Sequence, residues 1–115
     1  MAEKAYNLDY LNSISGGDQD FVKDMIVTFI INAPEEINKI KNWVTTENWQ
    51  KVGEDAHRFA SSLLFLGLDK LKDMAIQIEE MGLNQTNVHH ITVLLGQLEK
   101  GCYQIIEELK HDFNV

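Results

Sequence analysis

The sequence predicts an all-α fold, an up-and-down antiparallel four-helix bundle preceded by a short N-terminal helix. Apolar residues recur at three- and four-residue steps through four long segments, which places them on one face of a helix. The chain holds a single proline and few glycine-rich turns, which argues against a β-sandwich. Four amphipathic helices joined by short loops bury their apolar faces most simply as a bundle.

The first two elements lie before residue 46. Residues 8–15 are expected to form a short helical turn that ends at Gly16–Gly17. Asp18 is a good N-cap for the next helix, because its carboxylate can accept a hydrogen bond from a free amide of the first turn. That helix is predicted from Gln19 to Thr45. Pro34 lies inside it and cannot donate an amide hydrogen bond, so we expect a kink or a break near Pro34.

The third element is predicted to begin after Thr46, which we expect to be its N-cap, and to run to about Leu66. Trp49 is its first large apolar anchor. Gly67 is expected to end it in the left-handed conformation that glycine adopts readily. Its predicted core face comprises Trp49, Val52, Ala56, Phe59 (or Ala60), Leu63 and Leu66.

The fourth and fifth elements complete the bundle. Asp69 is expected to cap the fourth helix, which should end at Gly82. Thr86 or Asn87 caps the last helix, which should run to about His111. Short connections between these helices place consecutive helices antiparallel to each other.

Length and composition indicate one globular domain over residues 1–115. Hydrophobic residues make up 44% of the chain and charged residues 24%, which is an ordinary globular composition. The net charge of −8 argues against a nucleic-acid partner, which needs clustered positive charge, and disfavours an anionic membrane surface, so neither is expected. The start at Met1 and the lack of a flanking linker favour a free-standing protein, and we expect a monomer.

Three features of the sequence indicate the cellular compartment. No apolar run is long enough to span a membrane, and the N-terminus has no signal-peptide character. The single Cys102 rules out an internal disulfide framework, and on an apolar stripe it is expected to behave as a small hydrophobe. We therefore expect a cytoplasmic protein.

Metal sites are weakly supported by the pattern. A di-metal bundle needs inward-facing Glu-x-x-His pairs on two helices. Glu54 with His57 has this spacing in mid-helix, and Glu108 with His111 has it only in the last turn of the last helix. His89 and His90 are adjacent, so on a helix they point about 100° apart and cannot share one ion. No metal and no cofactor of the domain's own are expected.

His57 is the residue most suggestive of function. If the apolar residues of its helix form the core seam, His57 lies at the side of that helix. A histidine in such a place is most often a partly buried core residue. One turn away, however, lie mostly small residues, and one of them is a glycine that costs roughly 1 kcal/mol in mid-helix. The neighbours that we expect to line a docking surface are Gly53, Glu54, Ala60 and Leu64. We interpret the site as an exposed imidazole that another protein approaches to deliver a phosphoryl group.

The run H-R-F-A-S-S-L-L-F-L-G-L, residues 57–68, resembles the signature of histidine-containing phosphotransfer (HPt) domains. That signature runs His, any residue, Leu or Phe, Lys, Gly, Ser and, later, Leu-Gly. The positions that match it are His57, Phe59, Ser62, Leu66 and Gly67. The order of helices and the loop lengths are also similar to those of the family along nearly the full chain.

The resemblance implies that His57 accepts a phosphoryl group from a receiver-domain aspartate and passes it to another response regulator. The implied partners are receiver domains and a hybrid sensor histidine kinase, and the receiver would bring the Mg²⁺. No ATP-cradling motif is present, so no autokinase activity is expected. The alternative is an HPt-like docking module that binds a kinase or receiver without transfer.

Three residues are expected to support His57. Ala60 and Ser61 stand where the family usually has Lys and Gly, and Ser61 could still donate a hydrogen bond. Arg58 is adjacent but would have to curl back to reach the ring. Glu79 should be level with His57 on the next helix, where family members often have Gln. A carboxylate there could orient the ring and would also repel a phosphoryl group.

Overall fold

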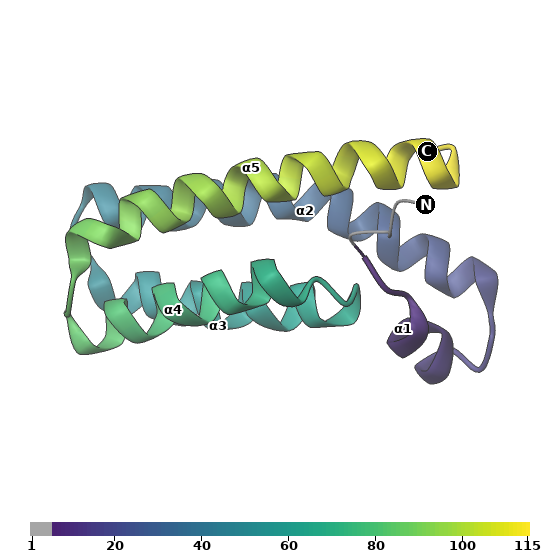
Figure 1. The fold of residues 1–115 in the computed structure, drawn as a ribbon, viewed down its shortest axis with the longest axis horizontal. Coiled ribbons are helices and arrows are strands. Elements are labelled where there is room, and N and C mark those ends of the chain that lie inside the picture. Colours follow the sequence, from purple (N-terminus) through teal and green to yellow (C-terminus); the bar gives the residue numbers. More distant parts are fainter. Residues whose placement is uncertain (1–5) are drawn as a thin grey trace.

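A computed structural model describes residues 6–115 and confirms the all-α fold, with no strand among those residues (Figure 1). Its helices are α1 (Asp9–Ile14), α2 (Gln19–Thr45), α3 (Trp49–Phe65), α4 (Asp69–Asn84) and α5 (Val88–Phe113). The long helices pack as an up-and-down bundle, with α5 alongside α2 and α3 alongside α4 (Figure 1). The short helix α1 lies at the end of the bundle where α3 turns into α4.

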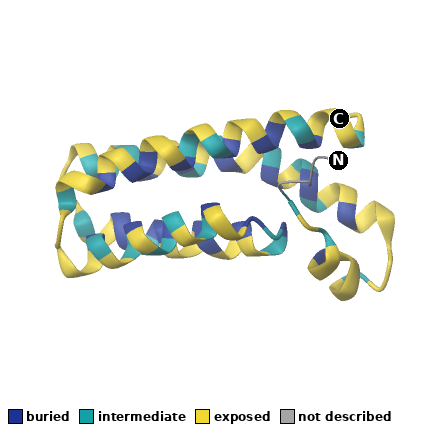
Figure 2. Ribbon diagram, in the orientation of Figure 1, coloured by how far each residue is buried: buried dark blue, intermediate teal, exposed yellow. Residues whose placement is uncertain are grey.

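The core of the bundle is filled by one apolar stripe from each long helix (Figure 2). Because these stripes recur at helical spacing, each helix turns the same face inward along its whole length. Side chains with almost no exposed surface include Ile26, Ile37, Ile40, Phe59, Leu63, Ile78, Ile91, Leu98 and Leu109. The periodicity therefore predicts the long helices and most of their inward-facing residues, although Trp49 is only partly buried.

Helix α2 begins as predicted and continues through Pro34. The carboxylate of Asp18 accepts hydrogen bonds from the amides of Asp20 and Phe21 at 3.0 and 3.2 Å. Of the two expected outcomes, a kink or a break, the break does not occur, because α2 is one α-helix on both sides of Pro34. Ala33 and Ile37 on either side of the proline are buried in the core, and their packing keeps the helix continuous. In Figure 1 the first turns of α2 slant away from α5, whereas the later turns follow it.

Helix α3 begins later than predicted, and Thr46 is not its N-cap. The hydroxyl of Thr46 donates to the carbonyl of Asn42 at 3.1 Å and so completes the end of α2. Glu47 then takes a left-handed conformation with φ of 57°. Asn48 is the N-cap, because its side-chain oxygen accepts from the amide of Lys51 at 3.3 Å. Thr46 therefore bonds a carbonyl at the end of α2, and Asn48 caps the start of α3.

The end of α3 is predicted correctly, whereas both ends of α4 differ from the prediction. Gly67 follows α3 with φ of +64°, which confirms the predicted left-handed turn. Asp69 is the first residue of α4 rather than its cap, and no side chain caps this helix. Gly82 does not end α4, which continues to Asn84 and is followed by the left-handed Gln85. Helix α5 ends at Phe113, two residues beyond the predicted end.

Gly82 lies inside α4 because the backbone of α3 passes directly over it. A Cβ atom at Gly82 would lie 3.0 Å from the carbonyl oxygen of Trp49 and 3.1 Å from the amide nitrogen of Gly53. A Cβ atom at Gly53 would in turn lie 3.2 Å from the carbonyl oxygen of Glu79 and 2.5 Å from the side chain of Leu83. The two glycines therefore permit a close contact between α3 and α4.

Gly96 has no such neighbour, and its replacement by alanine is expected to stabilise the protein. A Cβ atom there would have nothing within 4 Å, and the residue is exposed in the interior of α5. Because glycine is a poor helix former, Gly96→Ala should raise the free energy of unfolding by about 1 kcal/mol, measured by urea denaturation. Gly82→Ala is the matched control and should not show this gain, since its Cβ meets backbone. A loss of stability in Gly96→Ala would contradict this description of α5.

Candidate functional site

His57 lies on the surface of α3, beside the buried seam of that helix. Its side chain is 67% exposed, whereas Ala56 and Phe59 next to it are buried. The helix therefore presents the imidazole to solvent while its opposite face anchors it to the core. This position gives a second protein direct access to the ring.

Glu79 of α4 holds one edge of the imidazole. Its Oε2 lies 2.9 Å from Nδ1 of His57, and the carboxylate side chain is 21% exposed. The close approach at Gly53 and Gly82 brings α4 near enough for this contact. The structure thus confirms that Glu79 is level with His57 on the neighbouring helix.

This contact fixes the tautomer of the ring. An ionised carboxylate can only accept hydrogen bonds, so Nδ1 of His57 must be the protonated nitrogen that donates to Glu79. Nε2 then carries the free electron pair, and no hydrogen bond found among residues 6–115 engages it. The arrangement is that of an oriented nucleophile, with its reactive nitrogen at the ring edge away from the carboxylate.

Arg58 is held on another side of α3 and does not support the ring. Its guanidinium donates to Oδ1 of Asp55, whose Oδ2 accepts from the indole nitrogen of Trp43 at 2.8 Å. Trp43 belongs to α2, so this cluster joins α2 to α3. Asp55 is 4% exposed, and its carboxylate is matched by two donors. The expectation that Arg58 curls back toward His57 is therefore not met in the structure.

The expected docking residues divide into buried and exposed ones. Gly53 and Ala60 are buried, which corrects their predicted place on an exposed surface. Leu64 is 45% exposed, and Glu54 is partly exposed. Leu83, which sequence reasoning missed, is 43% exposed and contacts the position of Gly53. Leu83 could have been predicted from the sequence, because it lies one turn after Glu79 on the same face of α4.

The remaining polar neighbours of His57 make local contacts. The hydroxyl of Ser61 is 3.5 Å from the carbonyl oxygen of His57, at the limit of a hydrogen bond. The carboxylate of Glu54 accepts from Gln50 at 2.9 Å and pairs with Lys51 at 3.6 Å. The hydrogen bond from Gln50 is the main cause that lowers the pKa of Glu54. Ser61 and Glu54 thus border the ring, and neither reaches its nitrogens.

Other reactive groups lie apart from His57. Burial raises the pKa of the Cys102 thiol to about 12, so the thiol is protonated at neutral pH and inert as a nucleophile. No cluster of His, Cys, Asp and Glu within the described part of the chain could hold a metal ion. None of the helices in residues 6–115 has the length and apolar character needed to cross a membrane.

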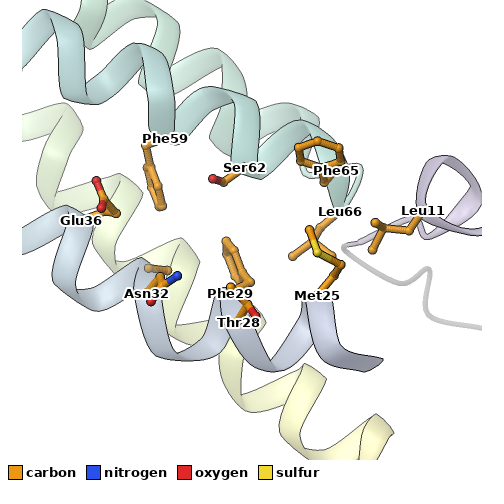
Figure 3. Close-up of a pocket in the computed structure, with 11 residues that line it drawn as sticks. Leu11, Met25, Thr28, Phe29, Asn32, Glu36, Phe59, Ser62, Phe65 and Leu66 are labelled. Carbon is orange, nitrogen blue, oxygen red and sulfur yellow. The ribbon is translucent and has the colours of Figure 1, made fainter. Parts of the chain in front are cut away.

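An apolar groove of about 120 Å³ lies between α2 and α3, close to α1 (Figure 3). Phe29 and Phe59 line it from the two helices, and Ser62 lies at its polar edge. His57 is not among the lining residues. The groove is therefore separate from the imidazole.

Removing the carboxylate of Asp55 is expected to destabilise the bundle. Asp55→Ala leaves the indole N–H of Trp43 without its acceptor and Arg58 without its partner. The expected loss is about 2–3 kcal/mol in the free energy of unfolding, measured by urea denaturation with Trp fluorescence. Asp55→Asn keeps an oxygen acceptor for the indole and should lose less. Equal losses in both variants would show that the charge, rather than the acceptor, matters.

Among protein-family models, that of the Hpt domain matches residues 24–110 of the chain. This region includes most of α2 and all of α3 and α4, and with them His57 and Glu79. Neither the curated proteins nor the solved structures yield a match to the chain.

Proposed function

Because the chain belongs to the Hpt domain family, we propose that it accepts a phosphoryl group on Nε2 of His57 from a receiver-domain aspartate and passes it to another response regulator. The family has a general role in phosphorelay histidine phosphotransfer. The observation that carries the specific proposal is the exposed imidazole whose Nδ1 is held by Glu79. This leaves Nε2 as the nucleophile at the surface.

The transfer step uses this geometry directly. The electron pair of Nε2 attacks the phosphorus of the phospho-aspartate, a new P–N bond forms, and the P–O bond to the aspartate breaks. The leaving carboxylate stays on the receiver, which would also supply Mg²⁺. The ring becomes positively charged while Nδ1 keeps its proton. The negative charge of Glu79, 2.9 Å from Nδ1, stabilises that charge as it develops.

The docking surface we propose has an apolar residue on each side of His57. Leu64 lies two turns further along α3, and Leu83 lies one turn beyond Glu79 on α4. Both leucines are more than two-fifths exposed, so a partner that approaches the imidazole from solvent could cover them. The proposed partners are receiver domains and a hybrid sensor histidine kinase, met by a monomer in the cytoplasm.

The proposal is tested by incubating the protein with a receiver domain carrying radiolabelled phospho-aspartate. We expect an acid-labile, base-stable label on this chain, the stability expected of phosphohistidine, and release of that label to a second receiver. Leu64→Asp and Leu83→Asp should each weaken receiver binding about tenfold or more, since they place a charge in an apolar contact. Val93→Asp is the control, because Val93 is 51% exposed on α5, a helix that carries neither His57 nor the two leucines.

A docking module without transfer is the second candidate. It is favoured by Ala60, which is 7% exposed and supplies no cation where the family usually has lysine. Binding of phosphorylated receivers with no label on this chain would support this candidate and reject the relay.

A further inference from the structure

We propose that Glu79 keeps the phosphorylated His57 ring protonated on Nδ1 and thereby makes the phosphoryl group short-lived and readily transferred. This inference rests on the proposed function and concerns the release of the phosphoryl group rather than its acceptance. It starts from one contact, the 2.9 Å approach of Glu79 Oε2 to Nδ1 of His57. That contact lies at the ring edge away from Nε2 and can persist after phosphorylation.

The proton on Nδ1 decides how well the ring leaves. In onward transfer an aspartate oxygen of the receiver forms a bond to phosphorus, and the P–Nε2 bond breaks with its electron pair going to Nε2. If Nδ1 carries a proton, the leaving group is a neutral imidazole in the tautomer that Glu79 already binds. If Nδ1 has lost its proton, the leaving group is an imidazolate anion, which leaves poorly. A group that retains this proton therefore speeds release.

A carboxylate retains the proton better than a neutral amide would. An amide oxygen can also accept a hydrogen bond from Nδ1, so it can orient the ring equally well. Only the carboxylate offsets the positive charge of the protonated, phosphorylated ring. Glu79 is 21% exposed, so water screens this attraction less than it would at a fully exposed pair.

The other charged groups near the ring do not replace this interaction. On α3, Glu54 is bound to Gln50 and Lys51, and Arg58 is bound to Asp55. On α4, Lys72 lies two turns before Glu79, level with Leu64, and Glu80 is exposed one residue further along the helix. Among the ion pairs found in residues 6–115, that of Glu79 is with His57. The charge state of the phosphorylated ring therefore depends mainly on Glu79.

The experiment labels His57 with phosphoramidate, a small phosphoryl donor that needs no receiver. Loss of the label is then followed by ³¹P NMR between pH 6 and pH 9, and ring protonation by ¹⁵N NMR. In Glu79→Gln the label should be lost roughly fivefold more slowly at pH 8, and Nδ1 should lose its proton at lower pH than in the unmodified sequence. Glu80→Gln removes the same charge one residue away and should match the unmodified protein.

Identical label lifetimes and identical Nδ1 protonation in Glu79→Gln and the unmodified protein would overturn the inference. Because glutamine preserves a hydrogen-bond acceptor, an effect of this variant reports the charge and not ring orientation. A label lifetime that depends on Glu79 supports the inference whether or not a receiver exchanges phosphoryl groups with His57. Failure of every receiver to exchange phosphoryl groups with His57 would reject the proposed function instead. Circular dichroism of each variant confirms that the bundle is folded.

Discussion

His57→Gln is expected to abolish phosphoryl labelling of this chain by any phosphorylated receiver. Glutamine offers an amide of similar size but no nucleophilic nitrogen, so no P–N bond can form. The side chain is 67% exposed, and the free energy of unfolding should change by less than about 0.5 kcal/mol. Labelling is measured by autoradiography, and folding by urea denaturation of the same preparation.

The matched controls are the exposed histidines at the start of α5. His89→Gln and His90→Gln remove the same chemical group at positions far along the chain from α3 and should leave labelling unchanged. His57→Gln should also still bind the receiver, since Leu64 and Leu83 remain in place. Persistence of label in His57→Gln would assign the acceptor to another residue and contradict the proposed role of the Glu79-bound ring.

Phe59→Ala should produce the largest loss of stability among the variants considered. Phe59 lies two residues after His57 but on the opposite side of α3, where it is 1% exposed and borders the groove between α2 and α3 (Figure 3). Truncating a buried phenylalanine removes apolar contacts and leaves a cavity, at a cost of about 3–5 kcal/mol. That is a large part of the roughly 5–15 kcal/mol that stabilises a domain. Urea denaturation followed by circular dichroism measures the change.

Leu64→Ala is the contrasting variant on the same helix. Its side chain is 45% exposed, so its removal should change the free energy of unfolding by less than about 0.5 kcal/mol while weakening receiver binding. Phe59→Ala should show the reverse, with binding retained at temperatures where the bundle stays folded. A large destabilisation by Leu64→Ala would show that this residue belongs to the core and not to the docking surface.

Much of the fold follows from periodicity, and the misplaced end of α4 comes from packing between helices. The cap at Asp18 uses amides of its own first turn, and the turn at Gly67 uses the left-handed φ that glycine favours, so both are predictable and both are confirmed. Gly82 looks like a helix end because glycine commonly ends helices, but it lies within α4 because the α3 backbone passes 3.0 Å from its absent Cβ. No local pattern contains that information.

The candidate site shows the same division. The position of Glu79 beside His57 is predictable, because two antiparallel helices joined by a short turn fix which residues are level. The partner of Arg58 is not, because Asp55 is also bonded to Trp43, which comes from α2. The burial of Gly53 and Ala60 likewise depends on how closely α4 approaches α3. Reasoning from one helix at a time cannot supply these contacts.

Gly53 on α3 and Gly82 on α4 also determine which substitutions the site beside His57 can accept. Sliding α4 by one turn would bring a side chain against the backbone where Gly82 now lies, so steric exclusion selects the register of the two helices. The juxtaposition of residues 57 and 79 is thus enforced by main-chain geometry and not by the ion pair between them. The residue at position 79 can therefore be exchanged without rebuilding the scaffold, which makes the reactivity of the imidazole tunable by a single substitution.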